Sequence, residues 1–254
     1  SNPEAREGKG SLVALVKGVK AQDIIDTLKF IPENLLSMVK EVTMDLSNSM
    51  NLIVRRCFPK ASRTIDGFMY RNWHVMPAGN EDSTPVGRHI EEADAIQEAR
   101  HSGKEYNPVT FANGDTRKQL LARSRYLLFK SSEKWTAIQK QRAAILFQLY
   151  PDIKEAYSLT HSLRMIFNKN KTKNESRLSL AKWYDKVDTS RFKSFNVIAS
   201  TLYEHYDEVL NFFNNRSTNA FAESFNAKIK QFRAQLRGVI DIKFFFFRLV
   251  KLYA

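Results

Sequence analysis

The sequence predicts an α/β fold whose small core, a sheet with helices, is interrupted by a large all-helical insertion. β-prone and helical segments alternate over residues 1–66, whereas helical periodicity dominates residues 91–215. A long amphipathic helix then opens the closing part of the core, residues 216–254. Residues 67–90 follow neither pattern and separate the first part of the core from the insertion.

The alternation in residues 1–66 predicts a parallel sheet, because a helix between two strands returns the chain to the same end of the sheet. Short β-prone runs predict strands at Ser11–Lys17, Val39–Met44 and Ala61–Ile65. Apolar periodicity predicts helices at Ala21–Phe30, Glu33–Met38 (opened by Pro32) and Leu46–Cys57, the last with Met50, Ile53 and Val54 facing inward.

Two of the predicted strands run directly into an aspartate. Asp45 follows Val39–Met44, and Asp66 follows Ala61–Ile65. Ligands of open α/β sheets bind beyond the carboxyl ends of the strands, where an exposed carboxylate can reach a metal ion. Asp45 could equally cap the helix that follows it, since Asp-Leu-Ser is a good helix opening. The local sequence leaves both interpretations of Asp45 open.

Residues 67–89 contain prolines and glycines but show no period of either a strand or a helix. A structureless stretch of this length inside a compact domain is uncommon and needs an explanation of its own.

The helical block contains a strongly basic amphipathic helix at Thr116–Lys130, after a turn at Asn113–Asp115. Its leucines should face inward, leaving a cationic surface that includes Arg117, Lys118, Arg123 and Arg125. Further helices are predicted at Ile90–Arg100, Lys134–Tyr150, Ile153–Asn168, Glu175–Val187 and Phe192–Asn214. The aromatic residues Trp135, Trp183 and Phe244–Phe247 are expected in the core rather than as base-stacking platforms.

The closing helix, Arg216–Gly238, has two distinct faces. Phe221, Phe225, Ile229 and Phe232 form an apolar face, while Asn219, Glu223, Asn226 and Lys230 share a polar one. Thr218 or Asn219 can cap its start. Glu223 can be the solvated ion-pair partner of a lysine, or a metal-ligating carboxylate beside a nucleic-acid groove. The sequence of the helix alone does not distinguish these two roles. Asp241–Tyr253 then suits a buried helix or strand.

Composition points to a polyanionic partner. The chain has 40 Lys and Arg against 27 Asp and Glu, for a formal charge of +13 and a pI near 9.7, which favours nucleic acid first and an anionic membrane surface second. No apolar run reaches the roughly 18 residues of a membrane span, and the first residues lack a signal peptide's apolar stretch. The single cysteine, Cys57, excludes an internal disulfide framework, and the protein is expected in the cytoplasm.

Three segments in this order resemble the DDE transposases of bacterial insertion sequences, specifically the IS-L-three group: VTMDLSNSM (Val42–Met50), FPKASRTIDGF (Phe58–Phe68) and RSTNAFAESFNAKIKQFRAQLRG (Arg216–Gly238). The segment Asn113–Lys130 also looks like the Bacteroides-type members. The likeness covers nearly the whole chain, and its third segment is the most specific.

The resemblance implies an RNase H-like core, a mixed sheet with helices. It also implies metal-dependent phosphodiester hydrolysis followed by strand transfer into target DNA. It implies two Mg²⁺ (or Mn²⁺) ions held by three carboxylates, because Mg²⁺ prefers oxygen ligands. Asp45 corresponds to the second acid of the triad and Glu223 to the third. Asp66 is expected to support the metal ligands or lie near DNA, as are Asn219 and Asn226.

The chain departs from the family pattern in two places. No aspartate precedes Asp23, so the first catalytic aspartate of the family is expected to be missing from this chain, along with the regions that recognise the ends of the element. At Asp66–Tyr70 the sequence reads D-G-F-M-Y where the family has D-R-F-H-V. Codons for Phe68–Pro77, in a shifted frame, can encode HVQKLA and its family continuation, which suggests that residues 67–89 are frameshifted and irregular.

The sequence therefore favours the catalytic domain of a transposase, in an incomplete form; the alternative is a non-catalytic DNA-binding remnant. A purely structural helical scaffold is disfavoured by the ordered motifs. The expected partners are DNA at the element ends and target, and a second copy in a homodimer, with nucleoid association in a bacterial cell. The DNA-contact candidates are Lys228, Lys230, Arg233 and Arg237, followed by the four basic residues of Thr116–Lys130; a solvated helix face is the alternative for each.

Overall fold

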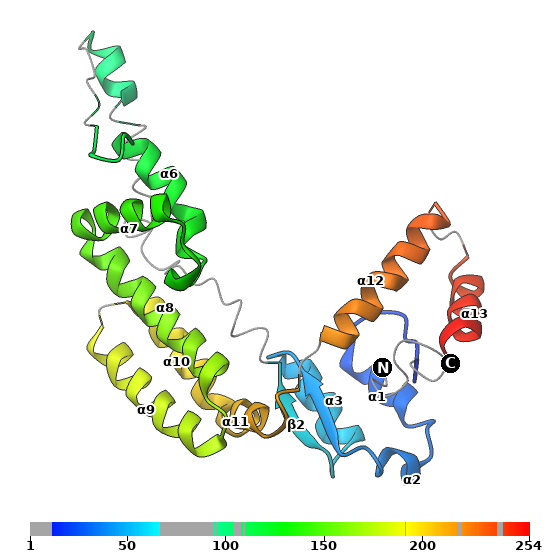
Figure 1. Cartoon of the computed structure of the whole chain (residues 1–254). Helices are drawn as coiled ribbons and strands as arrows, with labels where there is room; N and C mark the ends of the chain where they lie inside the picture. The colour runs from blue at the N-terminus through cyan, green and yellow to red at the C-terminus, as the bar shows by residue number, and fades with distance from the viewer. Residues whose placement is uncertain are drawn as a thin grey trace. The chain divides into compact units, whose positions relative to one another are not determined.

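A computed structural model describes residues 12–66, 94, 96–103, 108, 110–190, 192–217, 220–237 and 241–254. These residues are mostly helical, with one small parallel sheet (Figure 1). The chain divides into two compact units: the first combines Ser1–Tyr70 with His205–Ala254, and the second is Arg71–Glu204. The predicted irregular segment 67–90 lies outside the described residues.

The sheet of the first unit consists of two parallel strands, β1 (Glu41–Met44) and β2 (Ser62–Ile65). Their register places Met44 opposite Ile65, so the two strands end at the same edge. Helix α3 (Asn48–Cys57) connects them and contacts β1. The predicted parallel arrangement, with a helix between two strands, is confirmed.

Helix α1 (Ala21–Leu28) packs against α3, and the short α2 (Glu33–Leu36) follows it, both at predicted positions. The contact buries Ile25 against Ile53 and Cys57. Met50 does not face inward as predicted: it is 41% exposed, because α1 meets α3 through the later turns.

The predicted strand Ser11–Lys17 is wrong for its described part, since residues 12–17 form no strand. The Leu12 backbone N–H instead donates to the Tyr253 carbonyl at 3.0 Å. A β-prone run becomes a strand only when a neighbouring strand pairs with it, and here the chain meets a helix end.

Helix α11 (Tyr206–Asn215) covers β2 and completes the core of this part of the first unit. It buries Val209, Leu210, Phe212 and Phe213. The sequence predicted one helix over Phe192–Asn214, but α10 (Lys193–Glu204) ends before His205, and the two compact units divide at the same point.

The last two helices of the first unit, α12 (Ala220–Gln235) and α13 (Ile242–Tyr253), pack through aromatic rings. Phe225 meets Tyr253 edge-on at 5.0 Å between centroids, and Phe232 stacks on Phe245 at 5.8 Å. The expectation that all of Phe244–Phe247 is core is wrong, because Phe244 and Phe247 are each 53% exposed. Four consecutive residues of a helix point in four directions, so one partner cannot cover them all.

In the second unit, helix α6 (Arg117–Leu128) confirms the predicted basic helix and turns its leucines inward. A short 3₁₀ turn, η3 (Ser132–Lys134), leads to α7 (Ala137–Leu149), which starts later than predicted because Thr136 caps it. Leu120, Leu121, Leu127 and Leu128 pack with Ala143 and Leu146 of α7, and Trp135 lies against this cluster.

Helices α8 (Pro151–Lys169) and α9 (Lys173–Thr189) complete the second unit together with α10. Pro151 occupies the first helical position of α8, where its missing N–H costs nothing. Trp183 is 1% exposed and donates its indole N–H to the Leu159 carbonyl at 3.0 Å, which confirms its predicted place in the core. The predicted helix Ile90–Arg100 is helical at the described residues 94 and 96–100.

Candidate functional site

The two predicted aspartates lie next to each other at the carboxyl edge of the sheet. Asp45 directly follows β1 and Asp66 directly follows β2, one position beyond the Met44–Ile65 pair. The Asp66 N–H donates to the Met44 carbonyl at 3.1 Å, which extends the ladder to the aspartates. Asp45 is exposed, whereas Asp66 is only 2% exposed. The edge therefore offers one accessible carboxylate with a second, buried one beside it.

The alternative that Asp45 caps the following helix is wrong. Ser47 occupies the N-cap position of α3, with extended backbone angles, and the helix begins at Asn48. The Ser47 N–H donates to the Asp45 carbonyl at 2.7 Å, so the chain turns for two residues between strand and helix. This turn separates Asp45 from the first residue of the helix.

Helix α12 presents Glu223 in its first turn, on the side away from α13. Glu223 and Asn226 are exposed, whereas Phe225 is 3% exposed and packs toward α13. Ile229 and Phe232 are half-buried on the same apolar side, as the sequence predicted. Asn219 and the candidate cap Thr218 lie outside the described residues.

The basic candidates of α12 all lie on its solvent-facing surface. Lys228, Lys230 and Arg233 are exposed, and so is Arg237, which follows the helix with a left-handed φ of 53°. Phosphate contacts require such accessible cations. The prediction that these four residues contact DNA remains a prediction.

The described residues do not gather a complete metal centre. No group of three His, Cys, Asp or Glu side chains comes together among them in a way that could hold a metal ion. The convergence of Asp45 with Glu223 accordingly stays a prediction. The donors themselves suit a hard cation, because both are accessible carboxylates.

Sequence reasoning missed the contacts that join the entry of α12 to the sheet. The Asn215 amide, at the end of α11, donates to Glu41 Oε2 on β1 at 2.8 Å. Burial alone raises the pKa of the Glu41 carboxyl, but hydrogen bonds from the side chains of Ser217, Asn215 and Thr64 outweigh it and hold that pKa below its ordinary value. A glutamate in a strand carries no local signal of such partners.

Arg63 of β2 forms a second set of contacts with the helices on either side of it. Its guanidinium donates to the Asn51 side chain of α3 at 2.7 Å and pairs with Glu208 of α11 at 2.9 Å. The Asn211 amide donates to the Arg63 carbonyl at 2.9 Å. Together with the Glu41 contacts, these bonds fix α11 against the strands that carry the aspartates.

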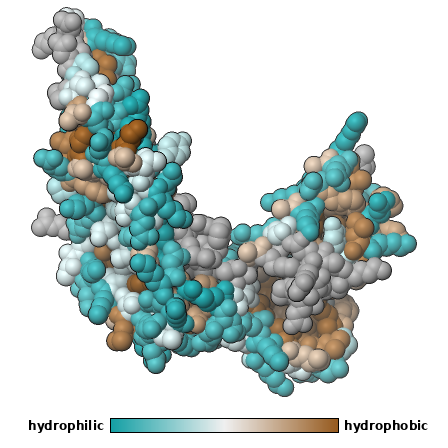
Figure 2. Space-filling model, viewed as in Figure 1, coloured by the Kyte–Doolittle hydropathy of each residue, from teal (hydrophilic) through white to brown (hydrophobic). Residues whose placement is uncertain are grey.

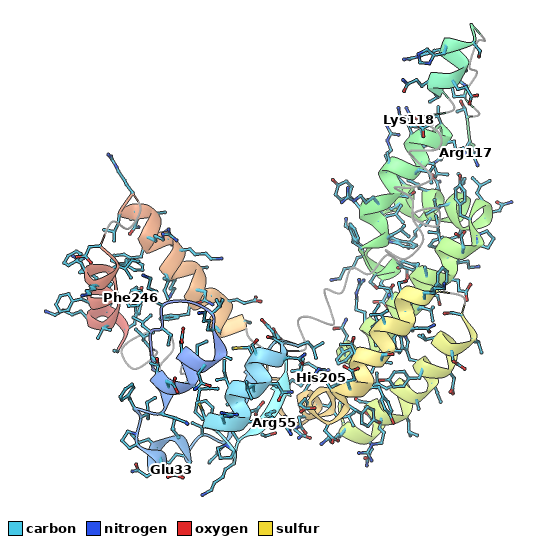
Figure 3. The ribbon with its side chains drawn as sticks, turned by 180° about the vertical axis from the view of Figure 1, so that it is seen from behind. Glu33, Arg55, Arg117, Lys118, His205 and Phe246 are labelled. Atoms are coloured by element: carbon cyan, nitrogen blue, oxygen red, sulfur yellow. The ribbon has the colours of Figure 1, made fainter. Side chains whose placement is uncertain are left out.

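In the second unit, two of the four basic candidates are exposed but make contacts with other side chains of the protein. Arg117, marked in Figure 3 at the start of α6, donates to the Tyr150 hydroxyl at 2.9 Å. Arg123 pairs with Asp115. Lys118 and Arg125 are exposed on α6. The structure thus gives Arg117 and Arg123 internal contacts that the helical pattern did not reveal.

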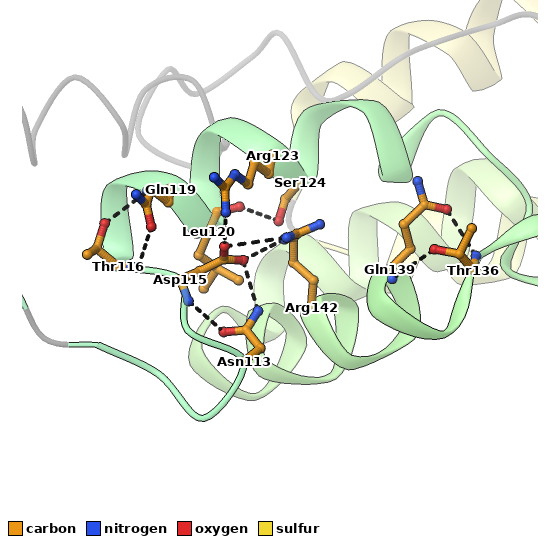
Figure 4. A network of polar contacts seen from close by, with 10 residues as sticks. All are labelled: Asn113, Asp115, Thr116, Gln119, Leu120, Arg123, Ser124, Thr136, Gln139 and Arg142. Atoms are coloured by element: carbon orange, nitrogen blue, oxygen red, sulfur yellow. Dashed lines mark hydrogen bonds and ion pairs between the residues drawn. The ribbon is translucent and has the colours of Figure 1, made fainter.

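Asp115 is the centre of that internal network, which Figure 4 shows. Its side chain is 2% exposed and accepts from Arg123, from Arg142 Nε at 2.6 Å and from the Asn113 amide at 2.9 Å. Burial raises the pKa of the Asp115 carboxyl, but the hydrogen bonds and positive charges of Arg142 and Arg123 more than offset this and lower it. The carboxylate stays ionised and ties α6 to α7.

The comparisons with known proteins identify the class. A transposase family, the DDE transposases of the IS-L-three type, matches residues 4–249. The chain therefore belongs to this family, as its motifs predicted. No curated protein and no solved structure matches it. None of the described helices combines the length and apolar character that crossing a bilayer demands.

Proposed function

We propose that this chain carries the catalytic core of a transposase that cuts and rejoins DNA strands, with Asp45 and Glu223 as catalytic carboxylates. The family supports a role in the transposition of an insertion sequence. The observation that carries the residue assignment is the accessible Asp45 at the carboxyl edge of a parallel strand pair, the place where α/β sheets bind ligands. Glu223 is the accessible carboxylate of the family's closing helix.

Asp45 and Glu223 would hold a divalent cation, Mg²⁺ or Mn²⁺. Mg²⁺ sites in phosphoryl-transfer proteins commonly use one or two carboxylates and complete the shell with water and phosphate oxygens, so two accessible carboxylates suit it. When bound, such a cation stabilises charge on phosphoryl oxygens and makes water a better nucleophile.

The remaining residues of the site have supporting roles in this proposal. Asp66, which is buried beside Asp45 at the carboxyl edge of the sheet, would support the metal ligands. Asn219 and Asn226 would lie near the DNA. The exposed cations of α12 bind the phosphate backbone: Lys228, Lys230, Arg233 and Arg237. The fold assignment that goes with these roles is an RNase H-like core interrupted by the helices of the second unit.

The test measures cation binding and DNA nicking together. Titration calorimetry with Mn²⁺ should show a site in the full chain that Asp45→Asn and Glu223→Gln each weaken by tenfold or more. The matched control, Asp188→Asn, removes an exposed carboxylate of the second unit and should change nothing. A crystal soaked with Mn²⁺ should place one ion between the Asp45 and Glu223 carboxylates.

Nicking of supercoiled plasmid in Mg²⁺ or Mn²⁺ decides whether the site is active. Nicking that disappears in both variants supports catalysis by these carboxylates. If Mn²⁺ binding and nicking are both indifferent to Asp45 and Glu223, the assignment is wrong. A chain that binds DNA but neither binds Mn²⁺ nor nicks is the DNA-binding remnant instead.

A further inference from the structure

Positive charge in the second unit is concentrated on helices α6 and α7. Residues 116–150 contain eight Lys and Arg and a single acidic residue, Glu133. In contrast, α9 intersperses its cations with Glu175, Asp185 and Asp188. Figure 2 shows hydrophilic side chains over much of the surface of this unit. The local excess on α6 and α7 is therefore not a general property of the unit.

Internal contacts engage three of these cations. Tyr150 engages Arg117, and the buried Asp115 engages Arg123 and Arg142. The remaining exposed cations of α6 and its C-terminal end are Lys118, Arg125 and Lys130. Among the residues that the structure describes, none of these three forms an ion pair with an acid.

The three cations share the exposed side of α6 with two further residues. Ala122 is exposed one turn after Lys118, and Tyr126, 68% exposed, follows one turn later. Buried residues occupy the opposite side: Leu120, Leu121, Ser124, Leu127 and Leu128. We name Lys118, Ala122, Arg125, Tyr126 and Lys130 the α6 basic face.

The acids nearest to this face do not neutralise it. Asp115 is buried and held by its two arginines, and Glu133 lies 4.0 Å from Lys169 Nζ. Residues 116–132 contain no Asp or Glu. The stretch of chain that carries the α6 basic face therefore presents cations and the Tyr126 hydroxyl to a phosphate without a carboxylate of its own.

The size and rigidity of the face suit a nucleic-acid backbone. From Lys118 to Lys130 the helix advances about 18 Å, which is the rise of roughly five base pairs of duplex DNA. Ala122, being small, lets a phosphate strand come close between the longer side chains, and Tyr126 adds a hydroxyl donor. The capping box of Thr116 and Gln119 and the Asp115 contacts hold the helix that carries the face.

We propose that the α6 basic face binds the phosphate backbone of duplex DNA, as a contact surface in the second unit separate from the carboxylates of the first. The choice of DNA as the polyanion rests on the proposed function. The α6 basic face itself is identified from the charge and exposure of its residues. Lys118 and Arg125, two of the four basic residues predicted to contact DNA from this helix, belong to this face together with Lys130 and Tyr126. The other two, Arg117 and Arg123, have structural roles.

The test compares salt dependence of DNA binding between two matched triple variants of the full chain. Fluorescence anisotropy of a labelled mixed-sequence duplex of about 20 base pairs gives the binding constant at several salt concentrations, in a buffer without divalent cations so that cleavage is excluded. Each lost phosphate contact should lower the slope of log K against log salt by about 0.9. Lys118→Ala/Arg125→Ala/Lys130→Ala should therefore lower the slope by about 2 to 3.

The control triple, Arg177→Ala/Lys182→Ala/Lys186→Ala, removes the same charge from exposed positions on α9 and should lower the slope by less than about 1. Equal effects of the two triples, or an unchanged slope in the α6 triple, overturn the α6 basic face. All six positions are exposed, so circular dichroism should show both variants folded. Mn²⁺ binding at Asp45 and Glu223 is measured without DNA, so failure of this surface and failure of the proposed function are distinguishable.

Discussion

Replacing Asp115 with asparagine should lower the free energy of unfolding of the second unit by about 3 kcal/mol at pH 7. The carboxylate is 2% exposed and faces Arg142, whose side chain is 13% exposed, so the change leaves a largely buried guanidinium without its counter-charge. Breaking a buried ion pair on one side costs about 3–5 kcal/mol. The lower end applies, because asparagine keeps one acceptor oxygen for a hydrogen bond.

Arg123 contributes much less to this cost. Its side chain is 55% exposed, and exposed pairs contribute about 0–1 kcal/mol because water solvates the separated charges. Arg123→Ala should accordingly change the stability by less than about 1 kcal/mol, whereas Asp115→Asn removes the partner of both arginines. The contrast between the two variants tests whether burial sets the magnitude.

Urea unfolding followed by tryptophan fluorescence is the appropriate assay. Trp135 packs against the α6–α7 cluster and donates its indole N–H to the Leu127 carbonyl at 2.8 Å, so its emission reports on this part of the unit. Glu155→Gln is the control, since it removes an exposed carboxylate from the same unit. A loss below about 1 kcal/mol for Asp115→Asn, or a loss equal to that of the control, would refute the reasoning.

The pH dependence gives an independent check with a definite sign. The pKa of Asp115 is lower in the folded protein than its ordinary value of 3.8, so the unfolded chain takes up the proton first as the pH falls. The stability from this group is therefore complete above about pH 5 and is lost progressively below about pH 4. Asp115→Asn should lack this component, and an acid profile identical to that of the unmodified chain would contradict the assignment.

Two further predictions concern single hydrogen-bonded positions. Glu41→Gln should lower the stability of the first unit by about 1–2 kcal/mol, because the charged acceptor of the Asn215 amide becomes neutral. Hydrogen exchange should speed up at the end of α11, and unaltered exchange would contradict this role. Because the pKa of Glu41 is lowered in the folded protein, its contribution to stability disappears only as the pH falls below about 4.5. Thr136→Ala should lower the stability of the second unit by about 1 kcal/mol in the same urea assay, since the Gln139 N–H loses the hydroxyl that caps it. Thr136→Ser keeps a hydroxyl and should retain most of that stability. Equal losses in the two variants would argue against capping.

Periodicity predicted the elements whose signal is local. The strands Glu41–Met44 and Ser62–Ile65, their parallel pairing and the aspartate after each follow from short β-prone runs separated by an amphipathic helix. The basic helix and the two faces of α12 follow from apolar spacing in the same way. Apolar spacing predicts such elements correctly because one face of each element is buried, whichever partner it packs against.

Predictions failed where an element depends on its partner. The β-prone run beginning at Ser11 forms no strand in its described part, and Phe244 and Phe247 are exposed although their neighbour Phe245 is buried. Propensity and hydrophobicity describe a residue, whereas pairing and burial depend on what lies opposite.

The sequence by itself determined the family, the cationic character of the chain and the two acidic strand ends, because motifs, charge and short-range periodicity are properties of neighbouring residues. Only the tertiary structure decided which charged groups are available for function. Arg142 and Asp115 are 27 positions apart, and Glu41 and Asn215 are 174 apart, so no local pattern records their pairing. Contacts with Tyr150 and Asp115 engage the guanidinium groups of Arg117 and Arg123, whereas no such contact with these partners engages Lys118 and Arg125.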